Sequence, residues 1–257
     1  MSKFLLGLNP EQKKAVTHTT GPLLVLAGAG SGKTRVVTHR IGYLLEQKAC
    51  RPENILAITF TNKAAGEMKA RLTKLIGSKG DAMTVCTSHS LGNRILREFY
   101  EAADIPRNFK ILPEQDRLAI LKAKLREATK RHETIDLMWL ASRISLAKNA
   151  GTSPADYPEE ADKGPLIRKV YTLYEKTLVK FVSLDFDDLL LRPLHLIRQD
   201  NAVLKKLQER FTFLSVDEYQ DTNRIQFETI RRLAAPRNNI CAVGDDDQGI
   251  YSWRGAD

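Results

Sequence analysis

Near its amino terminus the chain reads Leu23-Leu24-Val25-Leu26-Ala27-Gly28-Ala29-Gly30-Ser31-Gly32-Lys33-Thr34, and this stretch decides the fold. Four apolar residues predict a strand, the glycine-rich run predicts a loop, and a helix is expected to begin near Lys33. The run follows the pattern G-x-x-x-x-G-K-[ST], with Ala27 in place of the first glycine. Because both a strand and a helix flank the loop, a phosphate-binding loop is favoured over a chance glycine-rich turn. The chain is therefore predicted to bind a nucleoside triphosphate with Mg²⁺.

Glycines suit such a loop because successive backbone N–H groups must turn inward on phosphates, while the next helix adds its positive N-terminal end. We expect Gly28, Gly30 and Gly32 to supply this freedom and Ala27 to have an ordinary φ. Lys33 is expected to reach the β and γ phosphates, and the Thr34 hydroxyl to ligate Mg²⁺. The predicted nucleotide-binding residues of the loop are Ala27, Gly28, Ala29, Gly30, Ser31, Gly32, Lys33 and Thr34.

Strands and helices alternate on both sides of this motif. Apolar strands are predicted at 55–60, 83–87, 213–216 and 240–243, and helices at 63–76 and 91–100. Such alternation predicts an α/β fold with a parallel sheet and a ligand at the carboxyl ends of its strands.

The alternation of predicted strands and helices stops after about residue 104. Leucines at helical spacing fill 113–131, a loop rich in Pro, Asp and Gly runs from 149 to 165, and another helix is predicted at 167–182. We therefore predict a discontinuous motor domain of residues 1–88 and 199–257, with a mostly helical insertion at 89–198.

Composition narrows the classes of protein. Lys and Arg number 40 against 31 Asp and Glu, a net charge of +9, which favours a polyanionic partner such as nucleic acid but also suits a merely basic enzyme. Cys50, Cys86 and Cys241 lie far apart, so they indicate neither a zinc site nor a disulfide framework. Neither a signal peptide nor a membrane-spanning run is apparent. A cytoplasmic location is expected.

Asp217-Glu218 directly follows the predicted strand at 213–216. An acidic pair at a strand end is commonly just solvated. In a protein with a phosphate-binding loop, however, the same place suits a carboxylate for Mg²⁺ and a base for the attacking water. We assign Asp217 to the metal and Glu218 to the general base.

Longer motifs resemble the UvrD/Rep/PcrA helicases of superfamily 1. They are the run from Val216 to Asn223, the ending from Gly244 to Asp257, and Leu8-Asn9-Pro10-Glu11-Gln12. The resemblance covers nearly the whole chain and implies a RecA-like motor domain that hydrolyses ATP. It implies that Gln12 reads the adenine and that Gln248 and Arg254 contact the γ phosphate. The catalytic residues are then Lys33, Asp217, Glu218, Gln248 and Arg254.

The resemblance also implies a track for single-stranded DNA. Phe60, Tyr251 and Trp253 are candidate stacking surfaces, because every base offers a π face, although a lone aromatic is often a core residue. Relatives commonly have Gly-Thr-Phe-His-Ser where this chain has Cys86-Thr87-Ser88-His89-Ser90, so an aromatic is lost while His89 is kept. Gly249 stands where a serine is often found. The predicted DNA-binding residues are Thr59, Phe60, Thr61, Asn62, Lys63, His89, Tyr251 and Trp253.

A second acidic run, Asp185-Phe186-Asp187-Asp188, precedes two leucines. Three carboxylates suggest a metal, but an apolar helical face follows them. A cluster that caps a helix N-terminus is therefore the favoured interpretation.

The leading hypothesis is the amino-terminal motor half of an ATP-dependent 3′–5′ DNA helicase acting in replication or repair. By the resemblance its hydrolytic site needs a second RecA-like domain, which is expected to be missing, so the chain should not unwind DNA alone. The expected partners are single-stranded DNA, duplex junctions and that missing domain. A non-catalytic module that binds ATP and DNA is the alternative, whereas a phosphate-loop kinase has no phosphoacceptor site to support it.

Overall fold

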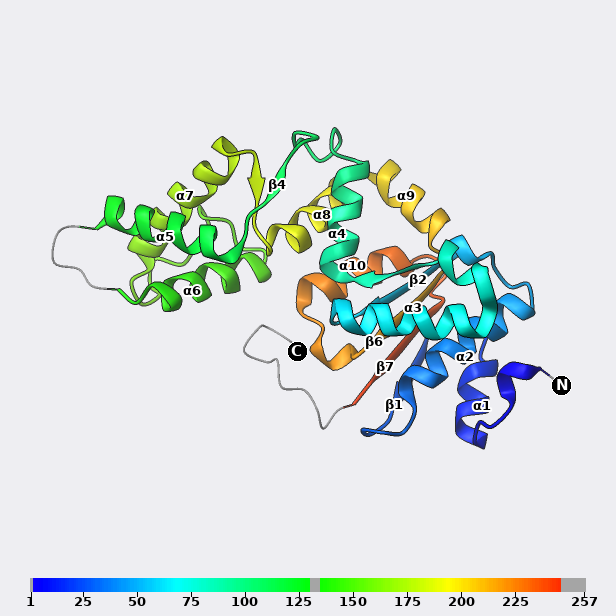
Figure 1. The fold of residues 1–257 in the computed structure, drawn as a ribbon. Helices are drawn as coiled ribbons and strands as arrows, with labels where there is room; N and C mark the ends of the chain where they lie inside the picture. Colours follow the sequence, from blue (N-terminus) through cyan, green and yellow to red (C-terminus); the bar gives the residue numbers. More distant parts are fainter. Residues whose placement is uncertain (1, 130–134, 246–257) are drawn as a thin grey trace. The chain divides into compact units, whose positions relative to one another are not determined.

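The computed structural model describes residues 2–129 and 135–245. The chain divides into two compact units, shown in Figure 1. The first comprises Met1–Leu91 and Asp200–Asp257 and is called the sheet unit. The second comprises Gly92–Gln199 and is called the helical unit. The division into domains at 88/89 and 198/199 stays a prediction.

Five parallel strands form the centre of the sheet unit. In spatial order they are β1 (Leu23–Leu26), β7 (Ile240–Gly244), β6 (Phe213–Asp217), β2 (Ile55–Thr59) and β3 (Thr84–Thr87) (Figure 1). The predicted α/β class and parallel sheet are confirmed. Each strand lies within about one residue of its predicted bounds, because buried parallel strands read as continuous apolar runs.

Helices cover this sheet. They are α1 (Pro10–Thr17), α2 (Lys33–Glu46), α3 (Asn62–Ile76), α9 (Asn201–Arg210) and α10 (Arg224–Ala234), with short 3₁₀ turns η1 (Lys3–Leu5), η2 (Pro52–Asn54), η3 (Gly77–Ala82) and η4 (Tyr219–Asp221). Val37 and Ile41 of α2, Met68 of α3 and Val243 of β7 are fully or almost fully buried in one apolar cluster. This packing holds the helices that follow β1 and β2 against the sheet.

The strand order brings the segments that follow β1, β6 and β7 to one edge of the sheet. β7 lies between β1 and β6, with Leu26 beside Gly244 and Asp217 beside Val243. The Ala27 N–H donates to the Gly244 carbonyl at 3.1 Å, which continues the β1–β7 pairing into the loop. Because parallel strands end at a common edge, the glycine-rich loop, the segment after β7 and Asp217 meet there.

The helical unit packs α5 (Glu114–Ala128), α6 (Leu137–Asn149) and α7 (Gly164–Lys180) around Leu121, Ile144 and Tyr174. It also contains α8 (Asp188–Gln199), while α4 (Ser88–Glu98) crosses the boundary between the units in sequence. A parallel pair of two-residue strands, β4 (Lys110–Ile111) and β5 (Ser183–Leu184), was not predicted. Two residues are too few to show the alternation by which a strand is recognised.

None of the helices within residues 2–129 and 135–245 is both long and apolar enough to span a bilayer.

Candidate nucleotide-binding site

The glycine-rich loop uses two of its three glycines for positive φ. Gly30 has φ 73° and Gly32, the N-cap of α2, has φ 87°, both in the left-handed region that favours glycine. Ala27 is not among the residues with positive φ, as predicted, and neither is Gly28. A Cβ built on Gly28 meets no atom within 4 Å. Neither φ nor crowding within the protein thus requires glycine at position 28, and its role in turning N–H groups toward phosphates stays a prediction.

Lys33 is held across the mouth of this loop. Its Nζ donates to the Ala27 carbonyl at 2.7 Å and pairs with Asp245 Oδ2 at 3.1 Å. The Asp245 side chain is only 4% exposed, so this is a mostly buried ion pair. Asp245 was absent from the predicted site, although the signal that identified Asp217 applies to it as well, an acidic residue directly after an apolar strand.

Asp217 faces the first turn of α2. The Thr34 hydroxyl donates to Asp217 Oδ2 at 3.3 Å. Burial, and then the neighbouring Glu218 carboxylate, raise the pKa of Asp217 above its ordinary value. Adjacent oxygen ligands of an octahedral Mg²⁺ lie about 3 Å apart, since each Mg–O bond is about 2.1 Å. The spacing of these two oxygens fits that ion.

The part of the chain that the structure describes forms no cage of protein ligands for the metal. Among the described residues no group of three or more His, Cys, Asp or Glu side chains could hold an ion. Magnesium in nucleotide sites typically keeps several waters and binds one or two carboxylates together with substrate phosphates. Thr34 and Asp217 match that sparser arrangement.

Glu218 turns the chain sharply at the end of β6. Its φ of 56° and ψ of 49° are left-handed, and η4 begins directly after it. Its N–H donates to Asp217 Oδ1 at 3.2 Å, and its carboxylate accepts from Gln220 Nε2 at 2.8 Å. A non-glycine residue in this region is strained, and such strain concentrates at functional sites. Gln220 had no place in the sequence-based site.

Gln12 lies beside the loop. It closes a capping box with Asn9 at the start of α1, and its Nε2 donates to the Ser31 carbonyl at 3.0 Å. A cavity of about 500 Å³ opens here, with Gln12, Lys33 and the half-exposed Leu24 and Leu26 among its lining residues. Apolar walls beside one amide suit a flat base. Adenine recognition by Gln12 remains a prediction.

The residues predicted to contact DNA within the described part of the chain follow β2 and β3. Thr59 is buried and its hydroxyl donates to the Thr61 carbonyl, while the Thr61 hydroxyl caps α3. Asn62 Oδ1 lies 3.5 Å from the hydroxyls of Thr87 and Ser90, two residues that the sequence analysis did not assign to the site. Several of these side chains thus also stabilise the turns that present them.

The remaining members of the predicted DNA segment differ in exposure. Lys63 is exposed, whereas Phe60 and His89 are partly buried. The predicted residues Gln248, Tyr251, Trp253 and Arg254 lie outside the described residues.

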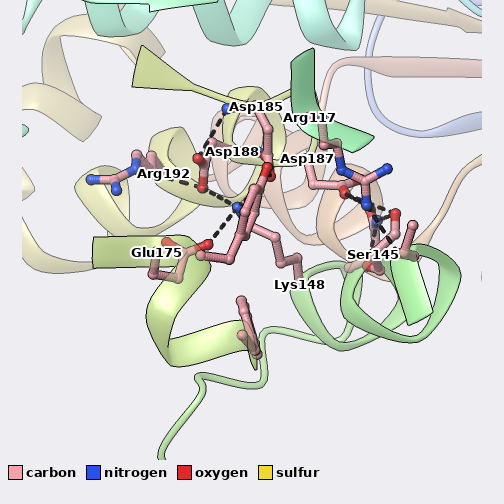
Figure 2. Close-up of polar contacts among 12 residues, drawn as sticks. Arg117, Ser145, Lys148, Glu175, Asp185, Asp187, Asp188 and Arg192 are labelled. Atoms are coloured by element: carbon pink, nitrogen blue, oxygen red, sulfur yellow. Dashed lines mark hydrogen bonds and ion pairs between the residues drawn. The ribbon is translucent and has the colours of Figure 1, made fainter. Parts of the chain in front are cut away.

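In the second acidic run, Asp185 and Asp188 pair with the buried Lys148, whereas Asp187 accepts from Ser145 and Asn149 (Figure 2). Asp188 N–H donates to Asp185 Oδ1 at 2.9 Å, and Asp185 N–H donates to Asp188 Oδ2 at 3.2 Å. These reciprocal bonds confirm the predicted cap at the start of α8. Lys148 Nζ lies 2.8 Å from Asp185, 2.9 Å from Asp188 and 2.9 Å from Glu175.

Charge compensation in this cluster is tight. Lys148 is 1% exposed, Asp185 0% and Asp188 2%. Burial alone lowers the pKa of Lys148, but Asp188 and Asp185 outweigh it and hold that pKa well above the ordinary value. The sequence analysis missed Lys148, because a lysine inside an amphipathic helix normally reads as a solvated residue.

Comparison with known proteins identifies close relatives. The UvrD/REP helicase N-terminal domain family matches residues 8–257. ATP-dependent DNA helicase PcrA of Bacillus subtilis (strain 168) is 46% identical over 258 residues, which cover 100% of this chain and 35% of that protein. The PcrA of Staphylococcus aureus (strain Mu50) is 44% identical over 259 residues, covering 100% of this chain and 36% of the relative. The chain thus spans 35% to 36% of the length of these curated relatives.

Proposed function

Because the chain belongs to the UvrD/REP helicase N-terminal domain family, we propose that it forms the ATP-binding motor half of an ATP-dependent DNA helicase. ATP hydrolysis would be coupled to 3′–5′ movement along single-stranded DNA and to unwinding in replication or repair. The observation that carries the proposal is the meeting of Thr34 with Asp217 at 3.3 Å, beside a lysine held between the glycine-rich loop and β7. The relative from Bacillus subtilis is named a DNA helicase, which supports DNA as the nucleic acid that this motor half would move along.

In this proposal the triphosphate lies along the glycine-rich loop and the N-terminal end of α2. Lys33 exchanges its contacts with Ala27 and Asp245 for the β and γ phosphates. Thr34 and Asp217 hold Mg²⁺, which would neutralise charge on the phosphate oxygens. Gln12 hydrogen-bonds the adenine at the rim of the apolar cavity.

Glu218 is the proposed general base. It stands one residue beyond Asp217, in a left-handed backbone conformation at the start of η4. A carboxylate beside the metal site can take a proton from the water that attacks the γ phosphate. Gln248 and Arg254 are proposed to contact that phosphate, on the family resemblance alone.

Single-stranded DNA is proposed to run past the ends of β2 and β3. The hydroxyl and amide groups there, including Thr61 and Asn62, suit contacts with sugar and phosphate, and Lys63 adds an exposed positive charge. Phe60, Tyr251 and Trp253 are proposed to stack on bases, and His89 to contact the same strand.

On their own, the 257 residues are proposed to bind ATP and single-stranded DNA weakly and not to unwind a duplex. In the family the site closes against a second RecA-like domain that supplies an arginine, and groups of that kind contribute about 10³- to 10⁵-fold in rate. Strong DNA-stimulated unwinding by the purified 257 residues would contradict this part of the proposal.

The test of the nucleotide chemistry is Glu218→Gln in the full-length gene product. The change keeps the shape of the side chain but removes the base, so ATP hydrolysis is expected to fall about 10²- to 10⁴-fold. The dissociation constant of ATP, measured by fluorescence titration or calorimetry, should stay near the parent value. Hydrolysis at the parent rate would exclude Glu218 as the base.

The test of the DNA assignment is Trp253→Ala. If its ring stacks on a base, the affinity for an oligothymidine should weaken by about 1–3 kcal/mol, as judged by fluorescence anisotropy. Trp139 of the helical unit offers a matched control, since Trp139→Ala should leave this affinity unchanged. Unaltered binding by Trp253→Ala would return that ring to a packing role.

A further inference from the structure

The side chain of Gln220 joins two strands of the candidate site. Its Nε2 donates to Glu218 Oε2 at 2.8 Å, and its Oε1 accepts from the Asp245 backbone N–H at 3.1 Å. Glu218 follows β6 and Asp245 follows β7, so one amide bridges the ends of neighbouring strands. A glutamine suits this place because it offers a donor and an acceptor on the same planar group.

The bridge continues to the phosphate-binding lysine. The backbone N–H of Asp245 donates to Gln220 Oε1, and Asp245 Oδ2 also pairs with Lys33 Nζ at 3.1 Å. Contacts therefore run from Lys33 through Asp245 and Gln220 to Glu218. All four residues belong to the sheet unit. Before ATP binds, these contacts connect the residue expected to touch the γ phosphate to the residue expected to activate water.

Glu218 needs such a support. Its backbone is left-handed, and it leaves the end of β6 on a short 3₁₀ turn rather than on a regular element. Gln220 Nε2 is the side-chain donor seen on its carboxylate within the described residues. A general base works only within hydrogen-bond reach of the proton that it takes, and small displacements are costly in rate.

The glycine at the end of β7 makes room for the bridge. A Cβ built on Gly244 lies 2.8 Å from Gln220 Oε1, while its other near contacts are at 3.5 Å and 3.6 Å. Gly244 does not have a positive φ, so its backbone conformation is open to alanine. The absence of a side chain at this position thus serves the approach of the glutamine amide.

We propose that Gln220 is a positioning residue for ATP hydrolysis, which orients the Glu218 carboxylate by fixing it to the end of β7. The inference rests on the proposed function, because it assumes that Glu218 is the base. It predicts a loss in kcat with little change in nucleotide affinity, since the side-chain bonds of Gln220 within the described residues are to Glu218 and Asp245 and not to the glycine-rich loop.

The first experiment compares Gln220→Leu with the parent in the full-length gene product. Leucine has a similar size but makes neither bond, so kcat for ATP should fall about 10- to 100-fold while KM and the dissociation constant of ATP stay within about 2-fold. Gln220→Glu keeps the acceptor for Asp245 N–H but loses the donor to Glu218, and it should show the same loss in kcat. The matched control is Gln226→Glu, which retains a capping box on α10 and should keep the parent kcat.

Gly244→Ala, at the end of β7, disturbs the same hydrogen bonds of Gln220. Its new Cβ displaces the flexible end of Gln220, so kcat should fall with the thermal midpoint nearly unchanged. This variant separates positioning from folding if Gln220→Leu proves unstable. Parent kcat in a folded Gly244→Ala or Gln220→Leu variant would overturn the proposal.

Glu218→Gln, measured alongside, distinguishes a failure of the positioning role of Gln220 from a failure of the proposed base. If Glu218→Gln abolishes hydrolysis while the Gln220 and Gly244 variants retain it, the positioning role is wrong and the proposed function stands. If Glu218→Gln itself hydrolyses ATP at the parent rate, the base assignment fails and the positioning role fails with it.

Discussion

Asp217-Glu218 in the sheet unit and Asp185-Phe186-Asp187-Asp188 in the helical unit both place carboxylates at the carboxyl end of a strand, but different groups face them. Asp185 and Asp188 share the ammonium of Lys148 at 2.8–2.9 Å and cap the start of α8. Asp217 instead meets a hydroxyl at 3.3 Å, and Lys33 is engaged elsewhere, by Asp245 and a backbone carbonyl.

This difference separates a structural cluster from a site. Asp185 and Asp188 already share a buried lysine at 2.8–2.9 Å, so a ligand would have to break short buried bonds to reach them. The contacts around Asp217 and Lys33 are fewer. Asp217 can exchange its bond from the Thr34 hydroxyl for a metal, and Lys33 can exchange the Ala27 carbonyl for a phosphate. An acidic pair after a strand becomes evidence for a site only when the groups opposite it can change partners.

Lys148→Met gives the sharpest test of this contrast. Removing one partner of a buried ion set leaves Asp185 and Asp188 uncompensated, so the free energy of unfolding should fall by about 3–5 kcal/mol. Trp139 on α6 reports the helical unit, and urea unfolding followed by its fluorescence in a Trp253→Phe background measures the loss. The control is Lys176→Met, at an exposed position of α7, and its free energy of unfolding should stay within about 0.5 kcal/mol of the parent value. A loss as small as the control's would mean that the cluster is as replaceable as a surface pair.

Lys33→Ala tests whether the sheet unit, unlike the acidic cluster of the helical unit, binds a ligand. Hydrogen bonds to charged groups contribute about 1.5–3 kcal/mol each, and two phosphates are involved, so ATP affinity should fall by more than about 100-fold. The free energy of unfolding should change by less than in Lys148→Met, because Lys33 pairs with one carboxylate whereas Lys148 pairs with three. Lys205→Ala, on α9, should alter neither quantity. ATP binding at the parent affinity would remove Lys33 from the site.

Much of the sheet unit was predictable because its strands are continuous apolar runs and its loop has a strict spacing. Lys33, Thr34, Asp217 and Glu218 do converge, since parallel strands end at one edge. Asp245 carries the same local signal as Asp217, but its pairing with Lys33 and its bond to Gln220 depend on β7 lying between β1 and β6, which no local pattern encodes. Lys148 was missed for a similar reason, since its three carboxylate partners are distant in sequence.

The glycine-rich loop illustrates the same limit at the level of single residues. Its pattern predicts glycine at positions 28, 30 and 32, but it does not reveal which of them require a left-handed backbone. The structure distinguishes them, with positive φ at Gly30 and Gly32 and not at Gly28. Gly32 is also crowded, since a Cβ there would lie 3.0 Å from Gln12 Nε2. Gly28 and Gly30 both face open space, so they differ in backbone conformation alone.

Gly30→Ala and Gly28→Ala therefore form a matched pair with the smallest expected effects on stability. Alanine at Gly30 must adopt a left-handed conformation, which should lower the free energy of unfolding by about 1–2 kcal/mol. Alanine at Gly28 meets no strain and should leave stability unchanged or raise it by up to about 1 kcal/mol, because it restricts the unfolded chain. Urea unfolding followed by far-ultraviolet circular dichroism measures both. Equal losses would show that the sign of φ does not decide which of these two glycines tolerates a side chain.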